Sequence, residues 1–304
     1  MYIFIINPTA GNGGAKKAYS KIAKTEEFKQ IQSQCFFTEY FGHAERIAAQ
    51  LATDFSESVT CVVVIGGDGT LHEVLNGLSE PVFPVSFIPV GSGNDFARGC
   101  GIKGNPVDIF QRIIRQNSSP YWLGCYQEKG KSPRTIVNSI GFGFDAEIAR
   151  AVNKSKYKKL LSMVYLGKIS YVIALIQVLF HYKPINVVLI ADGKKYKLSN
   201  CWMVTIAHHP FYGGGMKIIP NAKVQAGIFP VLLLHSISKW KVLGLFMTVF
   251  SGKHVNFKEV EVFEANRIEI SSEKSIPYQV DGQTSECYSC VITKHSEAIK
   301  VVGA

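Results

Sequence analysis

The stretch Val62–Gly77, VVVIGGDGTLHEVLNG, constrains the fold more than any other part of this sequence. It opens with a β-branched apolar run, Cys61–Ile65, which is typical of a strand covered on both faces in a parallel sheet. Gly66, Gly67 and Gly69 follow, and backbone without Cβ atoms can bring its N–H groups close to phosphate oxygens. The pattern predicts a strand, a phosphate-binding turn and the start of a helix.

The start of that helix is predicted from the capping-box spacing of Thr70 and Glu73, which would turn the positive end of the helix toward the glycines. A carboxylate such as that of Asp68 is unexpected beside bound phosphates. It would repel them unless it binds Mg²⁺, directly or through water, or takes a proton from an attacking hydroxyl. The simpler alternative is a strand-to-helix turn whose Asp satisfies backbone donors.

Length and charge narrow the class of protein. A chain of 304 residues with 47% hydrophobic residues predicts two domains, each with its own core. Lys and Arg outnumber Asp and Glu by 33 to 23, so the expected partner is anionic: a nucleotide, a nucleic acid or an acidic membrane surface. Neither a zinc-finger spacing nor an aromatic RNA-binding signature is present, so no nucleic-acid partner is expected.

The expected location is the cytoplasm. Seven scattered cysteines, an odd number, indicate reduced thiols. The longest apolar runs, Ile169–Phe180 and Val242–Phe250, are shorter than the ~20 residues that a membrane-spanning helix needs. The protein is therefore expected to be soluble or peripheral at the inner face of the membrane. The run Lys154, Lys156, Lys158 and Lys159 is a candidate contact with anionic headgroups, and a solvated helix face is the plainer reading.

Residues 1–120 predict a three-layer α/β nucleotide-binding domain with a mostly parallel sheet, because strands and helices alternate. Glycine-rich or small-residue loops follow Ile6, Ile65 and Ile88, and one crevice at the carboxyl ends of the strands could gather all three. Ser92 or Asn94 is expected to cap the helix that begins near Phe96. The expected strands are Tyr2–Ile6, Cys35–Thr38, Cys61–Ile65 and Val85–Ile88, and the expected helices include Lys16–Lys29, His43–Ala52 and one that opens at Asn105-Pro106.

Residues 121–290 predict a β-rich, antiparallel, sandwich-like domain. Asp192-Gly193 is a hairpin signal between two of its strands. For residues 291–304, a C-terminal segment, a return to the first domain is one option. The expected strands are Arg134–Ile140, Ile185–Ala191, Trp202–Ala207, Ile228–Leu234, Val260–Phe263 and Arg267–Ile270, and the expected helices are Asp145–Asn153, Ile169–His181 and Lys239–Phe250. His208 and His209 are expected in a loop or edge position and not as a pair of metal ligands.

Three segments together carry a resemblance to one family: INPTAGNGG at 6–14, VVVIGGDGTLHEVLNGL at 62–78 and IPVGSGNDFARG at 88–99. The chain resembles the diacylglycerol kinase and sphingosine kinase catalytic family, in its small bacterial lipid-kinase branch. Further matches run along nearly the whole length: Thr38 with Gly42-His43-Ala44, Asn138 with the run 141–145, Tyr212 with the glycines 213–215, and Val280-Asp281-Gly282. The resemblance implies a nucleotide domain, a lipid domain and a cleft between them.

The resemblance also implies a role for each matching residue, with ATP and Mg²⁺ as cofactors and a diacylglycerol-like lipid as the acceptor. Asp68 would be catalytic and would hold the metal, directly or through water. Asp281 would be a second catalytic residue that faces the cleft and helps to position the lipid hydroxyl. The nucleotide site would comprise Asn7, Gly11, Gly13, Gly14, Thr38, Gly66, Gly67, Gly69, Thr70, Ser92 and Asn94, with Asp95 in a supporting carboxylate network.

Three departures from the family pattern keep rival functions open. Trp122 and Ala226 stand where bacterial relatives usually carry carboxylates for a structural Mg²⁺, and Gln283 replaces a Glu proposed there as a base. One rival is therefore a catalytically impaired regulator that binds nucleotide or lipid. The other is an NAD kinase, which shares the GGDGT element but which the GSGNDFAR segment disfavours. The sequence leaves the lipid and the oligomeric state open.

Overall fold

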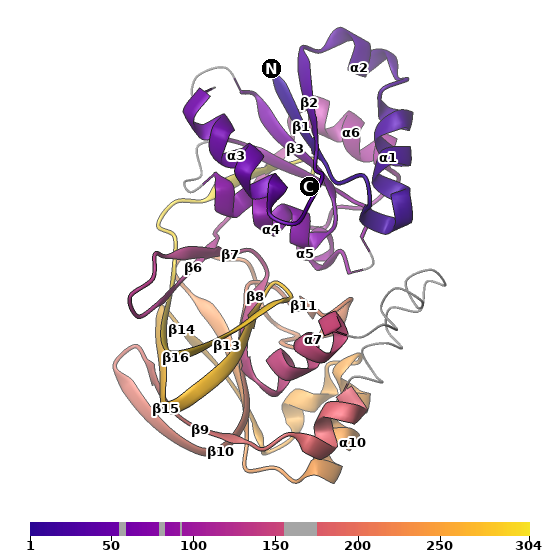
Figure 1. The fold of residues 1–304 in the computed structure, drawn as a ribbon. Helices are drawn as coiled ribbons and strands as arrows, with labels where there is room; N and C mark the ends of the chain where they lie inside the picture. Colours follow the sequence, from indigo (N-terminus) through magenta and orange to yellow (C-terminus); the bar gives the residue numbers. More distant parts are fainter. Residues whose placement is uncertain (55–58, 79–82, 92, 155–174) are drawn as a thin grey trace. The chain divides into compact units, whose positions relative to one another are not determined.

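The computed structural model describes residues 1–54, 59–78, 83–91, 93–154 and 175–304. They fold into two units, Met1–Leu123 with Glu297–Ala304 and Gly124–Ser296. Both chain termini belong to the first unit (Figure 1). Within the described ranges, no helix is long and apolar enough to cross a bilayer.

The first unit is built on a sheet to which the described residues contribute six strands, in the order β2-β1-β3-β4-β17-β5. β17 pairs parallel with β4 and antiparallel with β5, and the other pairs are parallel. Helices α3 and α4 lie on one face and α1 and α6 on the other (Figure 1), which gives the three predicted layers. The strands are β1 (Tyr2–Ile6), β2 (Ser33–Phe37), β3 (Cys61–Gly66), β4 (Val85–Pro89), β5 (Ser118–Tyr121) and β17 (Ile299–Val302). The helices are α1 (Ala10–Ile22), α2 (Glu26–Gln30), α3 (His43–Asp54), α4 (Asp68–Gly77), α5 (Asp95–Gly99) and α6 (Pro106–Ile114).

The central strands form where the apolar runs predicted them. Every residue of β1 (YIFII) and β3 (CVVVIG) is buried, because helices cover both faces of the sheet. Side chains on both sides of such a strand must be apolar, and this explains why neither run alternates with polar residues. The predicted α/β class is confirmed for this unit.

The single helix expected over Lys16–Lys29 is wrong. α1 ends at Ile22, and a separate short helix, α2, begins after Thr25, whose side-chain oxygen accepts a hydrogen bond from the backbone N–H of Phe28 at 3.3 Å. Thr25 is an N-cap that interrupts one continuous helical pattern. The helix predicted to open at Asn105-Pro106 is α6, with Pro106 at the first helical position, and the structure adds a capping box formed by Asn105 and Asp108.

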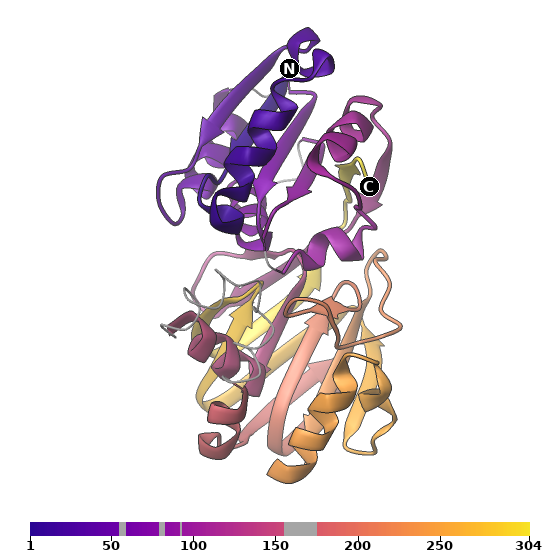
Figure 2. The same ribbon diagram turned by 90° about the vertical axis from the view of Figure 1, so that its right-hand side faces the viewer.

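The second unit is an antiparallel sheet that bends round a core. Its described strands follow the order β14-β13-β10-β8-β15-β16-β6-β7, and β9 pairs with both β10 and β15. Side chains such as Phe142, Val204 and Ile268 fill the enclosed core. A second apolar cluster lies under the helices α7 and α10; Figure 2 shows α10, in orange, along one side of the sheet. This confirms the predicted β-rich antiparallel class.

Most of the elements expected in this unit start within one residue of their predicted positions. The strand expected over Trp202–Ala207 instead starts at Lys194, the strand expected over Arg267–Ile270 continues to Val280, and the strand expected over Arg134–Ile140 is divided in two. The strands are β6 (Gly124–Glu128), β7 (Arg134–Ile136), β8 (Ser139–Gly143), β9 (Ile185–Ala191), β10 (Lys194–Ala207), β13 (Phe229–His235), β14 (Val260–Ala265), β15 (Arg267–Val280) and β16 (Gln283–Lys294). A small hairpin pairs β11 (Phe211–Tyr212) with β12 (Met216–Lys217). The helices are α7 (Phe144–Lys154), α10 (Lys239–Val249), the 3₁₀ helix η1 (Lys253–Asn256) and residues 175–181. The rest of the helix expected over Ile169–His181 lies outside the described residues, as do Lys156, Lys158 and Lys159.

Two tight turns have the chemistry that their residues predict. Asp192 and Gly193 have φ of 48° and 82° and join β9 to β10. Asp281 and Gly282 have φ of 50° and 88° and join β15 to β16. Positive φ at both central positions matches the twist of the flanking strands, and Asp-Gly adopts it at low cost. The hairpin predicted at Asp192-Gly193 is confirmed.

Candidate functional site

The three glycine-rich loops of the first unit meet, because β1, β3 and β4 are neighbouring parallel strands that end at the same edge of the sheet. Asn7 and Thr70 join the first two loops: Asn7 Nδ2 donates to Thr70 Oγ1 at 3.0 Å. The backbone N–H of Val90 donates to the carbonyl of Gly66 at 2.9 Å and joins the second loop to the third. The convergence expected from the sequence is therefore present.

The loop after β1 depends on glycine at one position above all. Gly11, Asn12 and Gly13 all have positive φ, so the chain makes a left-handed turn before α1 continues. A Cβ on Gly11 would lie 2.0 Å from the carbonyl oxygen of Val90. No side chain fits there, and this close approach is what packs the first loop against the third.

Asp68 connects the second loop to the third. Its carboxylate accepts hydrogen bonds from the backbone N–H groups of Asp95 and Phe96, at 3.2 and 3.1 Å. These donors lie in the first turn of α5, where helical N–H groups have no partner within the helix. Asn94 stands at the N-cap position, but its side chain makes no capping hydrogen bond. The expected cap from Asn94 is therefore wrong, because Asp68 satisfies those donors from another loop.

The capping box expected from Thr70 and Glu73 is also wrong. α4 begins at Asp68, with Gly67 at the N-cap. The hydroxyl of Thr70 accepts from Asn7, and Glu73 is buried and accepts from the backbone N–H of Ala44, at 3.2 Å, in the first turn of α3. Both side chains serve neighbouring elements and leave the N-terminus of α4 without a side-chain cap.

Gly69 leaves space for a ligand, and Asn94 provides a polar group for one. Apart from its chain neighbours and the backbone of α4, a Cβ on Gly69 would meet no described atom within 4 Å, and the φ of Gly69 is ordinary, so the described fold does not require glycine there. Asn94 Oδ1 is buried, and no described residue donates a hydrogen bond to it. Buried acceptors are normally paired. An open helix N-terminus suits a phosphate group, and the amide oxygen of Asn94 suits a hydrogen-bond donor on the same ligand, such as a hydroxyl group.

The other predicted nucleotide residues take the following places. Thr38 is buried directly after β2, and its backbone N–H donates to the carbonyl of Ile6. Asp95 Oδ1 accepts from Arg98 Nη1 at 2.9 Å, and Arg98 also donates to the carbonyl of Gly93. Ser92 lies outside the described residues. Among the described residues, no group of three or more His, Cys, Asp or Glu side chains is placed to hold a metal ion.

Asp281, in the second unit, organises backbone. Its carboxylate accepts three hydrogen bonds, from the backbone N–H groups of Val137, Asn138 and Ser139, at 2.9, 2.7 and 3.0 Å. The turn between β15 and β16 is thereby tied to the segment between β7 and β8. Gln283 is the first residue of β16 and is half-buried.

His208 and His209 lie in a bend directly after β10, and both are fully buried. His208 Nε2 is 3.3 Å from the carbonyl oxygen of Ile136, and His209 Nε2 is 3.0 Å from Asn138 Oδ1. Burial lowers the pKa of His208 well below its ordinary value and that of His209 to about 4. Both imidazoles are neutral structural groups near neutral pH.

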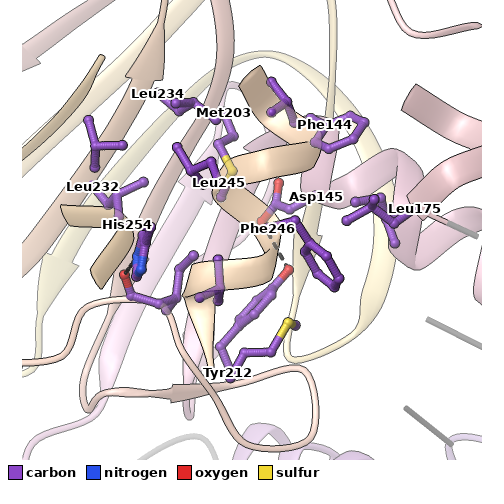
Figure 3. Close-up of a pocket in the computed structure, with 16 residues that line it drawn as sticks. Phe144, Asp145, Leu175, Met203, Tyr212, Leu232, Leu234, Leu245, Phe246 and His254 are labelled. Carbon is purple, nitrogen blue, oxygen red and sulfur yellow. Dashed lines mark hydrogen bonds between the residues drawn. The ribbon is translucent and has the colours of Figure 1, made fainter. Parts of the chain in front are cut away.

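The second unit also contains an apolar pocket (Figure 3). Its empty space, including the part that is open to solvent, is about 550 Å³. Leu245 and Phe246 enter it from α10, and Phe144 from the start of α7. The wall is mostly apolar, which suits a hydrocarbon chain.

One polar pair stands in this apolar pocket. Tyr212 Oη donates to Asp145 Oδ2 at 3.1 Å (Figure 3), and the backbone N–H of Ala146 donates to Asp145 Oδ1 at 2.8 Å. Burial raises the pKa of Asp145 to about 6 against these hydrogen bonds. Neither residue was predicted from the sequence to have a role in the site. The signal available was an Asp in the first turn of a helix that follows an apolar strand directly.

Together, the fold and the glycine loops define a two-unit protein: one unit is an α/β unit in which three glycine-rich loops meet, and the other is an antiparallel β unit that contains an apolar pocket. Comparison with known proteins gives the family. Residues 1–126 match the model of the diacylglycerol kinase catalytic domain, and residues 138–303 match that of the YegS C-terminal NAD kinase beta sandwich-like domain.

Similar proteins agree with the two family models. "Putative lipid kinase YtlR" of Bacillus subtilis (strain 168) is 30% identical over 93% of this chain and 93% of its own. A diacylglycerol kinase of Mycobacterium tuberculosis (strain ATCC 25618 / H37Rv) is 27% identical over 88% of this chain and 83% of its own. A solved structure of a putative diacylglycerol kinase from Bacillus anthracis str. Sterne shares the fold, with a TM-score of 0.78 and 22% identity over 99% of this chain and 96% of that one. The chain belongs to the diacylglycerol kinase catalytic family of lipid kinases.

Proposed function

We propose that this protein is an ATP- and Mg²⁺-dependent kinase that transfers the γ-phosphoryl group to a hydroxyl of a diacylglycerol-like lipid. The observation that carries the proposal is the convergence of the three glycine loops in a chain of this family. Phosphoryl transfer asks a protein mainly for positioning and for neutralisation of charge. Backbone N–H groups at a helix N-terminus supply both.

Each loop of the first unit has a proposed part in holding the nucleotide. Gly66, Gly67, Gly69 and Thr70 would surround the phosphates, and the open space at Gly69 supports this. Asn7 and the turn Gly11–Gly14 would line the nucleotide, with Thr38 near the base. Asn94 would offer its amide oxygen, to which no described residue donates, to a donor on the nucleotide, with Asp95 in support and Ser92 as a further contact. When bound, ATP would supply the transferable phosphoryl group and Mg²⁺ would balance its charge.

Asp68 is the proposed catalytic carboxylate. Two backbone donors of α5 fix its orientation, so its charge is held in place at the point where the second and third loops meet. It would act on Mg²⁺, directly or through water, or accept the proton of the lipid hydroxyl. The bonds to α5 also mean that the plainer alternative, a carboxylate that satisfies backbone donors, describes part of what Asp68 does.

The second unit is the proposed lipid unit. Its apolar pocket would take hydrocarbon from the lipid, and Asp145 with Tyr212 would offer a polar contact inside its described wall. Asp281 would act as a positioning residue: it holds the backbone of Val137–Ser139 and would place the lipid hydroxyl through that segment. The formal net charge of +10 supports a peripheral position on the anionic cytoplasmic face of a membrane.

The test is γ-labelled ATP with Mg²⁺ and a panel of acceptors in mixed micelles: diacylglycerol, a sphingoid base, a monoacylglycerol and, in buffer, NAD. We expect label in a lipid phosphate monoester. Label in NAD alone would support the NAD kinase alternative. Binding of ATP or of lipid with no transfer to any acceptor would support the regulator, the alternative that Trp122, Ala226 and Gln283 raise.

A further inference from the structure

Helix α10 carries apolar side chains on two faces. Val242, Leu245, Phe246 and Val249 face inward, where they are buried and line the apolar pocket. On the outside, Trp240 and Met247 are 72% and 74% exposed. They are seven residues apart, two helical turns, and therefore lie on one face. A helix that is apolar all round is ordinarily covered on all sides or set against a membrane.

The outer face continues onto residues 175–181. The Trp240 and Phe180 rings meet edge to face, with centroids 6.0 Å apart, and Lys239 Nζ donates to the carbonyl of Phe180 at 2.6 Å. Phe180 is 50% exposed, and Ile176, one turn before it, is 42% exposed. We call Ile176, Phe180, Trp240 and Met247 the outer apolar face. Contiguous exposed apolar side chains of this size mark an interaction surface.

The charged residues on the two segments that carry this face have one sign. Residues 236–258 contain four lysines, at 239, 241, 253 and 258, and no Asp or Glu. The described residues 175–191 add Lys183 and likewise contain no Asp or Glu. The nearest acidic partner on the chain, Glu259, is paired with Lys241 at 2.8 Å. An apolar face with a basic rim complements a bilayer that contains anionic lipid, where Trp and Phe sit at the headgroup level and Lys meets the phosphates.

We propose that the outer apolar face is the membrane-docking surface of this protein and that its partner is an anionic phospholipid bilayer. This inference rests on the proposed function and adds which face of the protein would contact the membrane. The outer side of α10 would enter the interface while its inner side forms a wall of the pocket, so that one helix separates the bilayer from the lipid site. Hydrocarbon could then pass from membrane to pocket along apolar side chains.

The test uses the full-length protein and sedimentation with vesicles of phosphatidylcholine, with and without phosphatidylglycerol. The double variant Trp240→Glu/Met247→Glu removes two exposed side chains from the face and leaves the pocket wall intact. We expect its partitioning onto the anionic vesicles to fall by about tenfold or more, because each side chain loses its transfer from water. Tyr288→Glu is the matched control: it changes an exposed aromatic residue on β16, 65% exposed, and should bind as the wild type does.

A second readout locates the contact. Lipids brominated near the headgroup should quench the fluorescence of Trp240, and the quenched component should vanish in Trp240→Phe. Partitioning of the double variant equal to that of the wild type, or no quenching of Trp240, would overturn the proposal. So would sedimentation equilibrium that shows a wild-type dimer, dispersed by the double variant, with no vesicle binding, because the face would then join two copies of the chain.

Activity separates this inference from the proposed function. The double variant should phosphorylate a short-chain diacylglycerol in micelles at the wild-type rate and lose rate on vesicles. A wild-type protein that docks through this face and phosphorylates no lipid would defeat the proposed function alone. A double variant that works as well on vesicles as in micelles would defeat the docking surface alone.

Discussion

Asp68 caps a helix that lies 27 residues further along the chain: its carboxylate accepts the backbone N–H of Phe96 at 3.1 Å and that of Asp95 at 3.2 Å. The proposed catalytic carboxylate is thus also the joint between two of the three loops. A substitution there has two effects, on charge and on the joint, and the two need separate measurements.

Asp68→Asn should lower the rate of lipid phosphorylation by about 10²-fold or more, because the charge is lost while the shape is kept. One oxygen can still accept a hydrogen bond, so the free energy of unfolding should fall by only ~1 kcal/mol. Asp108→Asn is the control, since Asp108 also caps a helix, α6, away from the three loops. It should lose similar stability and keep its rate. Wild-type rates in Asp68→Asn would remove Asp68 from the mechanism.

Gly69→Ala tests whether glycine is needed at this position to leave space for a ligand or to allow the protein to fold. The new methyl group meets open space, and Ala is favoured over Gly within a helix by up to about 1 kcal/mol, so the thermal stability should hold or rise. The affinity for ATP should fall, since the methyl group would stand where a phosphate is proposed. Gly66→Ala is the contrast, because its Cβ would lie 2.8 Å from Thr70 and should cost stability. Unchanged ATP binding by Gly69→Ala, measured calorimetrically, would argue against phosphates at this loop.

Asp281→Asn tests the turn between β15 and β16. The carboxylate accepts three backbone hydrogen bonds, and an amide can replace only part of them, so we expect a loss of ~1–3 kcal/mol in the free energy of unfolding. The rate with lipid should fall as well. Gln283→Glu restores an acidic side chain beside the turn and should raise the rate of a weakened kinase, whereas a pure binding protein should stay silent. If neither variant changes the rate, the turn has no part in the chemistry.

Asp145→Asn should change how stability depends on pH. Burial raises the pKa of Asp145 from 3.8 to about 6, so the folded protein holds this proton more tightly than the unfolded chain. The wild type therefore loses stability through this group as the pH rises from about 4 to about 6, by about 3 kcal/mol in all. Asp145→Asn has no carboxyl group to titrate here, so it lacks this pH-dependent loss of stability. Its free energy of unfolding relative to the wild type should climb over this window and level off above it, and a flat difference in denaturant titrations would contradict the shift.

The sequence predicted elements whose reasons are local. β1 and β3 are apolar runs between loops. Asp192-Gly193 forms a hairpin turn, and Asn105-Pro106 begins a helix. The signal for each of these elements lies within a few residues of the sequence. For the opposite reason, the two strands at one end of the first sheet, β5 and β17, were not predicted, although a return of residues 291–304 to the first domain was one option. β5 and β17 are short, and they form because the end of the chain returns to pair with both β4 and β5.

The same limit applies to the site. Glycine spacing indicated three loops that meet, and they do. The hydrogen-bond partners of the polar side chains could not be predicted, because they come from distant segments. Glu73 accepts a hydrogen bond from the first turn of α3, and Tyr212 donates to Asp145, 67 residues away in the sequence. Local spacing suggested a capping box at Thr70 and Glu73, but both side chains form hydrogen bonds with distant segments instead.

The most direct measurement is the transfer of label from γ-labelled ATP to diacylglycerol in mixed micelles, by wild type and Asp68→Asn side by side, with Mg²⁺ and after chelation. The account predicts a labelled lipid phosphate monoester for the wild type with Mg²⁺, and almost none for Asp68→Asn or without the metal. No labelled lipid from folded wild-type protein that binds ATP, or equal label from Asp68→Asn, would contradict it.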